Sequence, residues 1–186
     1  MKKFPLAILL ATSMASGMVL ADNHTISAGY AQSKVEGFKN IRGMNLQYRY
    51  EFGSPLSVLG SFSYMKGDEQ QNYFAFGNSV NNSIDAKYYS LLAGPAYRIN
   101  EYVSLYALGG VAYAKATGTT KWANVTNDYV GYESISEKST SFAYGFGVIL
   151  NPVANFSVNV GYEGTQADLD GGRSINGFNV GVGYRF

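Results

Sequence analysis

The chain has 186 residues, of which 15% are charged and 15% are aromatic, and it contains 22 Gly and no Cys. Charged residues usually make up about a quarter of a globular protein, and so many aromatic residues are not typical of a disordered chain. The lack of Cys excludes a disulfide framework, a thiolate metal site and a cysteine nucleophile. A formal net charge of +1 gives no reason to expect nucleic acid as a partner.

The first 21 residues have the pattern of a secretory signal peptide, which implies export by the general secretory route. Lys2 and Lys3 form a short basic start, a mostly apolar run follows, and cleavage is expected between Ala21 and Asp22. An uncleaved membrane anchor is the alternative, but the apolar run is short and interrupted by Thr, Ser and Gly. The mature chain, 22–186, is expected to form one domain. Without Lys2 and Lys3 it has 12 Lys and Arg against 13 Asp and Glu, a net charge of −1.

Alternating side chains dominate the mature chain. Between Arg42 and Phe52, the even positions after Arg42 are apolar or aromatic and the odd positions are small or polar. A repeat of two residues indicates a β-strand with two unlike faces. The same pattern predicts eight strands, within 26–31, 42–52, 56–64, 88–98, 103–113, 142–151, 156–163 and 177–186.

Short and long connections alternate between these strands. Three are tight, at 53–55, 99–101 and 151–155, and four are longer, at roughly 32–41, 65–86, 116–139 and 166–174. An even number of strands that are long enough to cross a bilayer when tilted is typical of outer-membrane barrels. The expected fold class is all-β: an eight-stranded antiparallel transmembrane β-barrel with short periplasmic turns and four longer extracellular loops.

A soluble β-sandwich would also contain strands with this repeat. However, its outer face would be charged, whereas the second face of these strands is Gly, Ser, Ala and Asn. Such a face suits a narrow polar lumen, and Tyr and Phe near the strand ends suit aromatic girdles at the membrane interfaces. Pro95 fits less well, because proline cannot donate to a ladder. A bulge or a missing hydrogen bond is therefore expected near Gly94 and Pro95.

The alternation places five charged side chains inside the barrel: Arg49, Glu51, Arg98, Glu163 and Arg185. Eight strands enclose a space that side chains can fill, so no open pore is expected. Because isolated interior charges are costly, these residues are expected to form a structural polar network with one another and with interior Asn, Gln and Tyr residues. A proton or ion path through the same residues is the alternative.

No catalytic residue, metal site or cofactor is expected, and the protein is not expected to be an enzyme. The single histidine, His24, is the third residue of the mature chain and is expected to be solvated at the periplasmic end. The many Ser residues have no base placed to activate them. The acidic residues Asp68, Glu69, Asp168 and Asp170 are expected to be solvated loop charges. A lipid-modifying enzyme is therefore a weaker hypothesis than the two non-catalytic functions given below.

Five stretches of strand and tight turn carry a family resemblance: 29–33 (GYAQS), 43–51 (GMNLQYRYE), 93–99 (AGPAYRI), 160–164 (VGYEG) and 177–186 (GFNVGVGYRF). Together they resemble the OmpX/Ail/PagC/Lom family of small enterobacterial outer-membrane proteins, in particular its PagC/Ail branch. The last stretch resembles the signal that the barrel-insertion machinery reads, which would make Phe186 an assembly residue and that machinery a partner. In the family, host-cell attachment, invasion and complement resistance are attributed to the loops.

Candidate contact residues lie in the expected loops: Lys34, Lys39 and Arg42 in the first, Tyr73, Phe74 and Phe76 in the second, and Lys121, Trp122, Tyr129 and Tyr132 in the third. Basic side chains suit lipopolysaccharide phosphates or sulfated host glycans. Exposed aromatic side chains are candidate anchors for a protein partner. Two alternatives stay open: the basic residues bind only lipopolysaccharide, and the aromatic residues only pack the protruding strands together.

The resemblance implies a surface protein of the cell outer membrane that acts in host-cell adhesion, invasion or serum resistance. Its expected partners are outer-membrane lipid, lipopolysaccharide, and host cell-surface, matrix or complement-regulatory proteins, with no nucleic acid. The alternative is a structural protein that maintains the envelope and has no host ligand.

Overall fold

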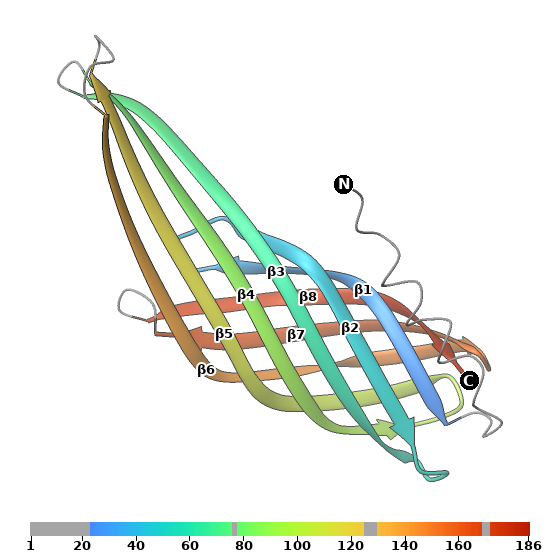
Figure 1. Cartoon of the computed structure of the whole chain (residues 1–186). Helices are drawn as coiled ribbons and strands as arrows, with labels where there is room; N and C mark the ends of the chain where they lie inside the picture. The colour runs from blue at the N-terminus through green and yellow to red at the C-terminus, as the bar shows by residue number, and fades with distance from the viewer. Residues whose placement is uncertain (1–22, 76–77, 125–129, 169–171) are drawn as a thin grey trace, which may run out of the picture.

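The computed structural model describes residues 23–75, 78–124, 130–168 and 172–186. Eight strands close into an antiparallel barrel, in which each strand pairs with its neighbours in sequence and the first pairs with the last (Figure 1). They are β1 (His24–Val35), β2 (Asn40–Glu51), β3 (Leu56–Ala75), β4 (Asn78–Arg98), β5 (Val103–Asn124), β6 (Val130–Val153), β7 (Phe156–Ala167) and β8 (Arg173–Arg185). The expected fold class is confirmed. The cleavage expected between Ala21 and Asp22 lies outside the described residues and stays a prediction.

The two faces of the barrel wall have opposite polarity. In β2, Asn45, Gln47, Arg49 and Glu51 are buried, whereas the residues between them are exposed and apolar or aromatic. Polar residues thus face the lumen and apolar residues face outward, the reverse of a soluble protein. An outward apolar band is what hydrocarbon requires, and the closed ladder leaves no strand edge within it. In the described part of the chain, no helix has the length and apolar character needed to cross a membrane.

Four strands are much longer than the other four. β1, β2 and β7 have 12 residues and β8 has 13, whereas β3, β4, β5 and β6 have 20, 21, 22 and 24. Roughly 9–11 residues cross a bilayer. The long strands therefore continue beyond the barrel as a four-stranded sheet, at the end opposite the C-terminus (Figure 1). We call this extension, 67–75, 78–86, 116–124 and 130–137, the outer sheet.

The expected long connections are largely strand. The β3–β4 ladder runs to the pair Ala75–Asn78, and the β5–β6 ladder runs to Ala123–Val130. These segments are rich in Ser, Thr, Asn and charged residues on both faces, so they lack the polarity contrast by which a strand is recognised in sequence. Pairing with a neighbour nevertheless satisfies their backbone groups. The protein consequently presents a paired sheet at this end where longer loops were expected.

The irregularity expected at Pro95 is a short interruption of strand pairing, without a bulge. The β4–β5 ladder is interrupted at Gly94 and Pro95, but the same register resumes beyond them. On the other side, Pro95 stays in register with Val58 of β3. Gly94 allows the close approach of β5 here, because a Cβ at this position would lie 2.2 Å from the carbonyl oxygen of Ala107. The only register shift between described strands lies in β6–β7, between Leu150 and Val153.

Candidate functional site

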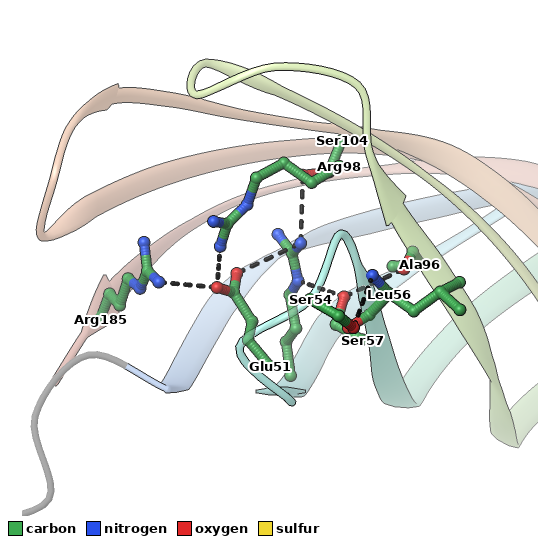
Figure 2. A network of polar contacts seen from close by, with 9 residues as sticks. Glu51, Ser54, Leu56, Ser57, Ala96, Arg98, Ser104 and Arg185 are labelled. Carbon is green, nitrogen blue, oxygen red and sulfur yellow. Dashed lines mark hydrogen bonds and ion pairs between the residues drawn. The ribbon is translucent and has the colours of Figure 1, made fainter.

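The end of the lumen nearest the short turns holds one carboxylate among three guanidinium groups (Figure 2). Glu51 of β2 lies 3.2 Å from Arg49 and 2.7 Å from Arg185 of β8, and it also accepts a hydrogen bond from Arg98 of β4. The side chains of Arg49 and Glu51 are only 3% and 4% exposed. Alternation along each strand turns all four side chains inward, so one carboxylate links three strands across the lumen.

Serine side chains complete this cluster. The Nε of Arg49 donates to the Oγ of Ser57 at 2.8 Å, and its Nη2 donates to the Oγ of Ser104 at 3.1 Å. Ser57 in turn donates to the carbonyl of Ala96 at 3.1 Å. The small side chains of β3 and β5 leave room for the long guanidinium side chain and also satisfy its donors. The sequence analysis missed these partners, although their inward parity and small size could have indicated them.

Glu163 forms a second, separate centre in the lumen. It accepts hydrogen bonds from the hydroxyl of Tyr88 at 2.6 Å and from the Oγ of Ser63 at 2.9 Å. Ser63 also accepts from the amide of Asn45 at 3.0 Å. No arginine contacts Glu163 among the ion pairs of the described residues. The five interior charges are thus divided between an arginine cluster and a hydroxyl-bound carboxylate.

The middle of the lumen is filled. The space among Gln47, Tyr106, Glu163 and Asn179 is too narrow to hold a water molecule. Side chains of this size span an eight-stranded barrel. The geometry therefore favours a structural plug over a wide channel.

His24 is half-buried and makes side-chain contacts that the sequence did not indicate. Its Nδ1 lies 2.7 Å from the Tyr48 hydroxyl, and its ring centroid lies 4.9 Å from that of Tyr50 and 6.0 Å from that of Phe186. The backbones of His24 and Phe186 exchange two hydrogen bonds, of 3.2 and 2.9 Å. Sequence separation concealed this contact, because only barrel closure brings β1 and β8 together. The histidine and the C-terminal phenylalanine therefore meet at the seam between β1 and β8.

The aromatic residues expected to contact a partner differ in their surroundings on the outer sheet. Trp122 packs within the outer sheet, since its indole ring lies where a Cβ of Gly131 would approach it to 3.2 Å. Tyr132 is 66% exposed and is the register partner of the exposed Lys121. Tyr132 and Lys121 lie on the face of the outer sheet opposite to Trp122. The backbones of Tyr73 and Phe74 belong to β3, but their side chains, and all of Phe76 and Tyr129, lie outside the described set.

Basic residues form a row that the sequence analysis only partly identified. Lys39 contacts Glu69 at 3.7 Å, and Lys34 faces outward on β1. Arg42 is the first of five cations that are successive partners across the sheet: Arg42, Lys66, Lys87, Lys115 and Lys138. We call this set the cation row. Like charges directly opposite each other repel, so the row favours an anionic partner.

The cation row lies at the outer limit of the apolar band. On β3, β4 and β5, a tyrosine lies two positions closer to the barrel than each lysine of the row: Tyr64, Tyr89 and Tyr113. These tyrosines are register partners, and the centroids of neighbouring rings are 4.9 and 6.2 Å apart. Tyrosine is enriched at membrane–water interfaces, where its ring lies at the headgroup level. A cation placed one step further outward meets the polar headgroups.

Two of the four acidic residues expected to be loop charges lie on a strand. Asp68 and Glu69 belong to β3, Asp168 follows β7, and Asp170 lies outside the described residues. Among the residues with described positions, no three His, Cys, Asp or Glu side chains gather as a metal site.

Comparison with known proteins agrees with this architecture. The family described as "Enterobacterial Ail/Lom protein" matches residues 2–186. The virulence membrane protein PagC of Salmonella typhimurium is 44% identical over 191 residues, and the attachment invasion locus protein of Yersinia enterocolitica is 40% identical over 195, each alignment covering both chains completely. The crystal structure of Yersinia pestis Ail in complex with the heparin analogue sucrose octasulfate is 38% identical, covers 90% of this chain and 100% of its own, and superposes with a TM-score of 0.67. The chain therefore belongs to the enterobacterial Ail/Lom family and is a β-barrel protein of the outer membrane.

Proposed function

We propose that the protein is a non-catalytic attachment protein of the cell surface, which binds host cell-surface, matrix or complement-regulatory proteins through its outer sheet. The names of two relatives, attachment invasion locus protein and virulence membrane protein, support this class of function. The arginine cluster and Glu163 serve as the structural plug that holds the sheet on a rigid barrel. In the orientation usual for outer-membrane barrels, the short turns face the periplasm and the outer sheet faces the exterior.

The observation that carries the proposal is the edge of the outer sheet along β6. Among the described residues, the β6–β7 ladder ends at Ala143–Thr165, whereas the β5–β6 ladder continues to Ala123–Val130. An edge strand presents backbone groups on which another chain can pair. Addition of an extended segment to such an edge is a recurring mode of peptide recognition, in which backbone hydrogen bonds supply affinity.

The opposite edge, along β3, is partly covered by the start of β2. A Cβ at Gly67 would lie 3.2 Å from the carbonyl oxygen of Asn40, so the two backbones are close beyond the last β2–β3 pair. The ion pair between Lys39 and Glu69 lies further along the same edge. The β6 edge is therefore the better site for a partner.

Two lysines placed on the β6 edge test this proposal. The variant Ser134→Lys/Ser136→Lys puts charge on the edge, which natural proteins use to block strand addition. The control Thr117→Lys/Thr119→Lys puts the same charge on the register partners in β5, one strand from the edge. We expect the edge variant to bind matrix-coated surfaces and cultured cells at least tenfold more weakly, and the control to bind as the unaltered protein. Equal binding by both variants, measured with purified protein in bilayer nanodiscs, would exclude the β6 edge.

A structural envelope function is the second candidate, and the cation row favours it. Phosphates of lipopolysaccharide lie at the level of the outer headgroups, where charge-assisted hydrogen bonds from lysine are strong. The variant Lys66→Gln/Lys115→Gln should retain less lipopolysaccharide after purification, whereas Lys121→Gln, on the outer sheet, should retain the normal amount. If the row variant loses lipopolysaccharide and envelope integrity while the unaltered protein binds no host surface, the envelope function replaces the first proposal.

A further inference from the structure

A cavity of about 370 Å³ lies at the outer mouth of the barrel, between the inner face of the outer sheet and the β1–β2 turn. It is larger than any space in the polar lumen described above and its lining is mostly apolar. Ligand pockets in proteins begin at about 300 Å³ and are typically lined by apolar side chains with a few polar groups. The cavity therefore has the size and character of a binding pocket. Lys87 and Lys115 of the cation row also belong to its lining.

The floor of the pocket is built by register. Ile84, Gly118 and Ile135 are successive partners across β4, β5 and β6, so two large side chains flank a residue without one. In the next row toward the barrel, Ala86 and Ala116 occupy β4 and β5. Small residues on the central strand and isoleucines on its neighbours form a trough.

Gly118 keeps this trough open. A Cβ at this position would have no heavy atom within 4 Å, and its backbone does not occupy the left-handed region. Glycine weakens a strand interior, so it usually marks a bulge or a place where another group approaches closely. No described group approaches Gly118, so the space above it is open to a ligand.

The far wall and the rim limit what the ligand can be. Phe38, Ile41 and Ile175 close the pocket opposite the trough. Its charged lining residues are of both signs: Glu137 against Lys87, Lys115 and Arg173. The pocket lies at and beyond the level of the cation row, which is outside the hydrocarbon where lipid chains reside. Mixed charges around an apolar hollow suit a polypeptide better than an amphiphile with a single charged head.

We propose that the pocket receives a large apolar side chain, aromatic or leucine-like, from an extended partner segment that adds to the edge of β6. This inference rests on the proposed function and names the chemistry of the partner. Ile135 belongs both to the pocket and to the edge, so the two surfaces are continuous. Neighbouring strands lie about 4.8 Å apart and alternate side chains share one face. A partner residue opposite Ile135 on the inner face therefore lies beside the pocket.

Filling the pocket provides the test. Gly118→Leu places a side chain in the open space, whereas the control Thr119→Leu adds the same side chain at the next residue, on the opposite face. Both variants are first checked for a folded barrel by circular dichroism in nanodiscs. We expect Gly118→Leu to weaken binding to matrix-coated surfaces and cells at least tenfold and Thr119→Leu to leave it unchanged.

Isoleucine methyl NMR of the protein in nanodiscs tests the pocket without a natural partner. N-acetyltryptophanamide should shift the signals of Ile84 and Ile135 in the unaltered protein and in Thr119→Leu, and should shift neither in Gly118→Leu. N-acetylalaninamide, which lacks a large side chain, should shift neither in any of them. Shifts caused by an octanoyl amide but not by the tryptophan compound would identify a lipid-type ligand and overturn the inference.

The two proposals fail in different ways. If lysines on the β6 edge abolish binding and Gly118→Leu does not, strand addition stands and the pocket inference is wrong. If neither change affects binding, the β6 edge itself is excluded. If N-acetyltryptophanamide shifts no signal in the unaltered protein, the pocket inference falls whatever the edge variants show.

Discussion

Replacing Glu51 with glutamine removes the carboxylate that contacts Arg49, Arg98 and Arg185 in the arginine cluster. Glutamine has nearly the same shape and keeps one acceptor oxygen, so the change is mainly one of charge. Arg49, Arg98 and Arg185 then remain together with no counter-ion from Glu51, and Arg49 retains only its bonds to two serines. We expect the barrel to close but to be less stable.

The expected magnitude follows from the exposure of the three arginines. Breaking a buried ion pair by removing one partner costs about 3–5 kcal/mol, whereas an exposed pair contributes about 0–1 kcal/mol. Arg49 is 3% exposed, but Arg98 and Arg185 are 32% and 19% exposed and can be solvated from the periplasm. The burial of Arg49 therefore dominates, and we expect a decrease of about 3 kcal/mol in the free energy of unfolding, the lower end of the buried range.

Urea unfolding in lipid bilayers, followed by circular dichroism, measures this decrease. Glu101→Gln is the control, because Glu101 is an exposed carboxylate in a turn at the same end of the barrel. The double variant Arg49→Gln/Glu51→Gln should be more stable than Glu51→Gln alone, since it removes the buried positive charge as well. A loss from Glu51→Gln no greater than that from Glu101→Gln would refute the cluster as the source of stability.

Three further changes are assayed by the same unfolding measurement. Gly94→Ala should cost about 1–3 kcal/mol, because its Cβ would meet the backbone of β5, whereas the nearest atom to a Cβ at Gly60 lies 4.0 Å away and Gly60→Ala should be tolerated. Equal effects would contradict the close approach. Tyr88→Phe should cost about 1.5–3 kcal/mol, because Glu163 loses a charged hydrogen bond; an unchanged midpoint would place the stabilisation elsewhere. His24→Ala should cost about 1 kcal/mol through the lost aromatic contacts at the seam, and a stable barrel that fails only during insertion would show that the seam matters for assembly alone.

The assembly signal expected at the C-terminus is a separate prediction. Phe186 pairs with His24 at the seam, so its removal affects closure as well as any recognition by the insertion machinery. Phe186→Leu keeps an apolar terminus but removes the ring. We expect slower insertion in cells and nearly normal stability once the barrel has formed. Insertion at the normal rate would count against Phe186 as the signal.

The barrel itself could be predicted from the sequence because lipid and lumen demand opposite side chains. In β2 this contrast falls on successive residues, so parity alone placed Arg49 and Glu51 inside and Tyr48 and Tyr50 outside. The same reasoning predicted inward positions for Arg98, Glu163 and Arg185. It could not divide them into two centres, because which residues meet across the lumen depends on the stagger of strands distant in sequence.

Features that depend on register appeared only in the folded chain. The outer sheet has polar residues on both faces, so its strands carry no periodic signal, and their pairing is set by continuation of the ladders from the barrel. The cation row and the trough at Gly118 each combine single residues from different strands. Residues such as Lys66 and Lys115 look like isolated loop charges along the chain. Alternation within a strand is a local property, whereas alignment between strands is set by the whole closed barrel, and that alignment created both candidate binding surfaces.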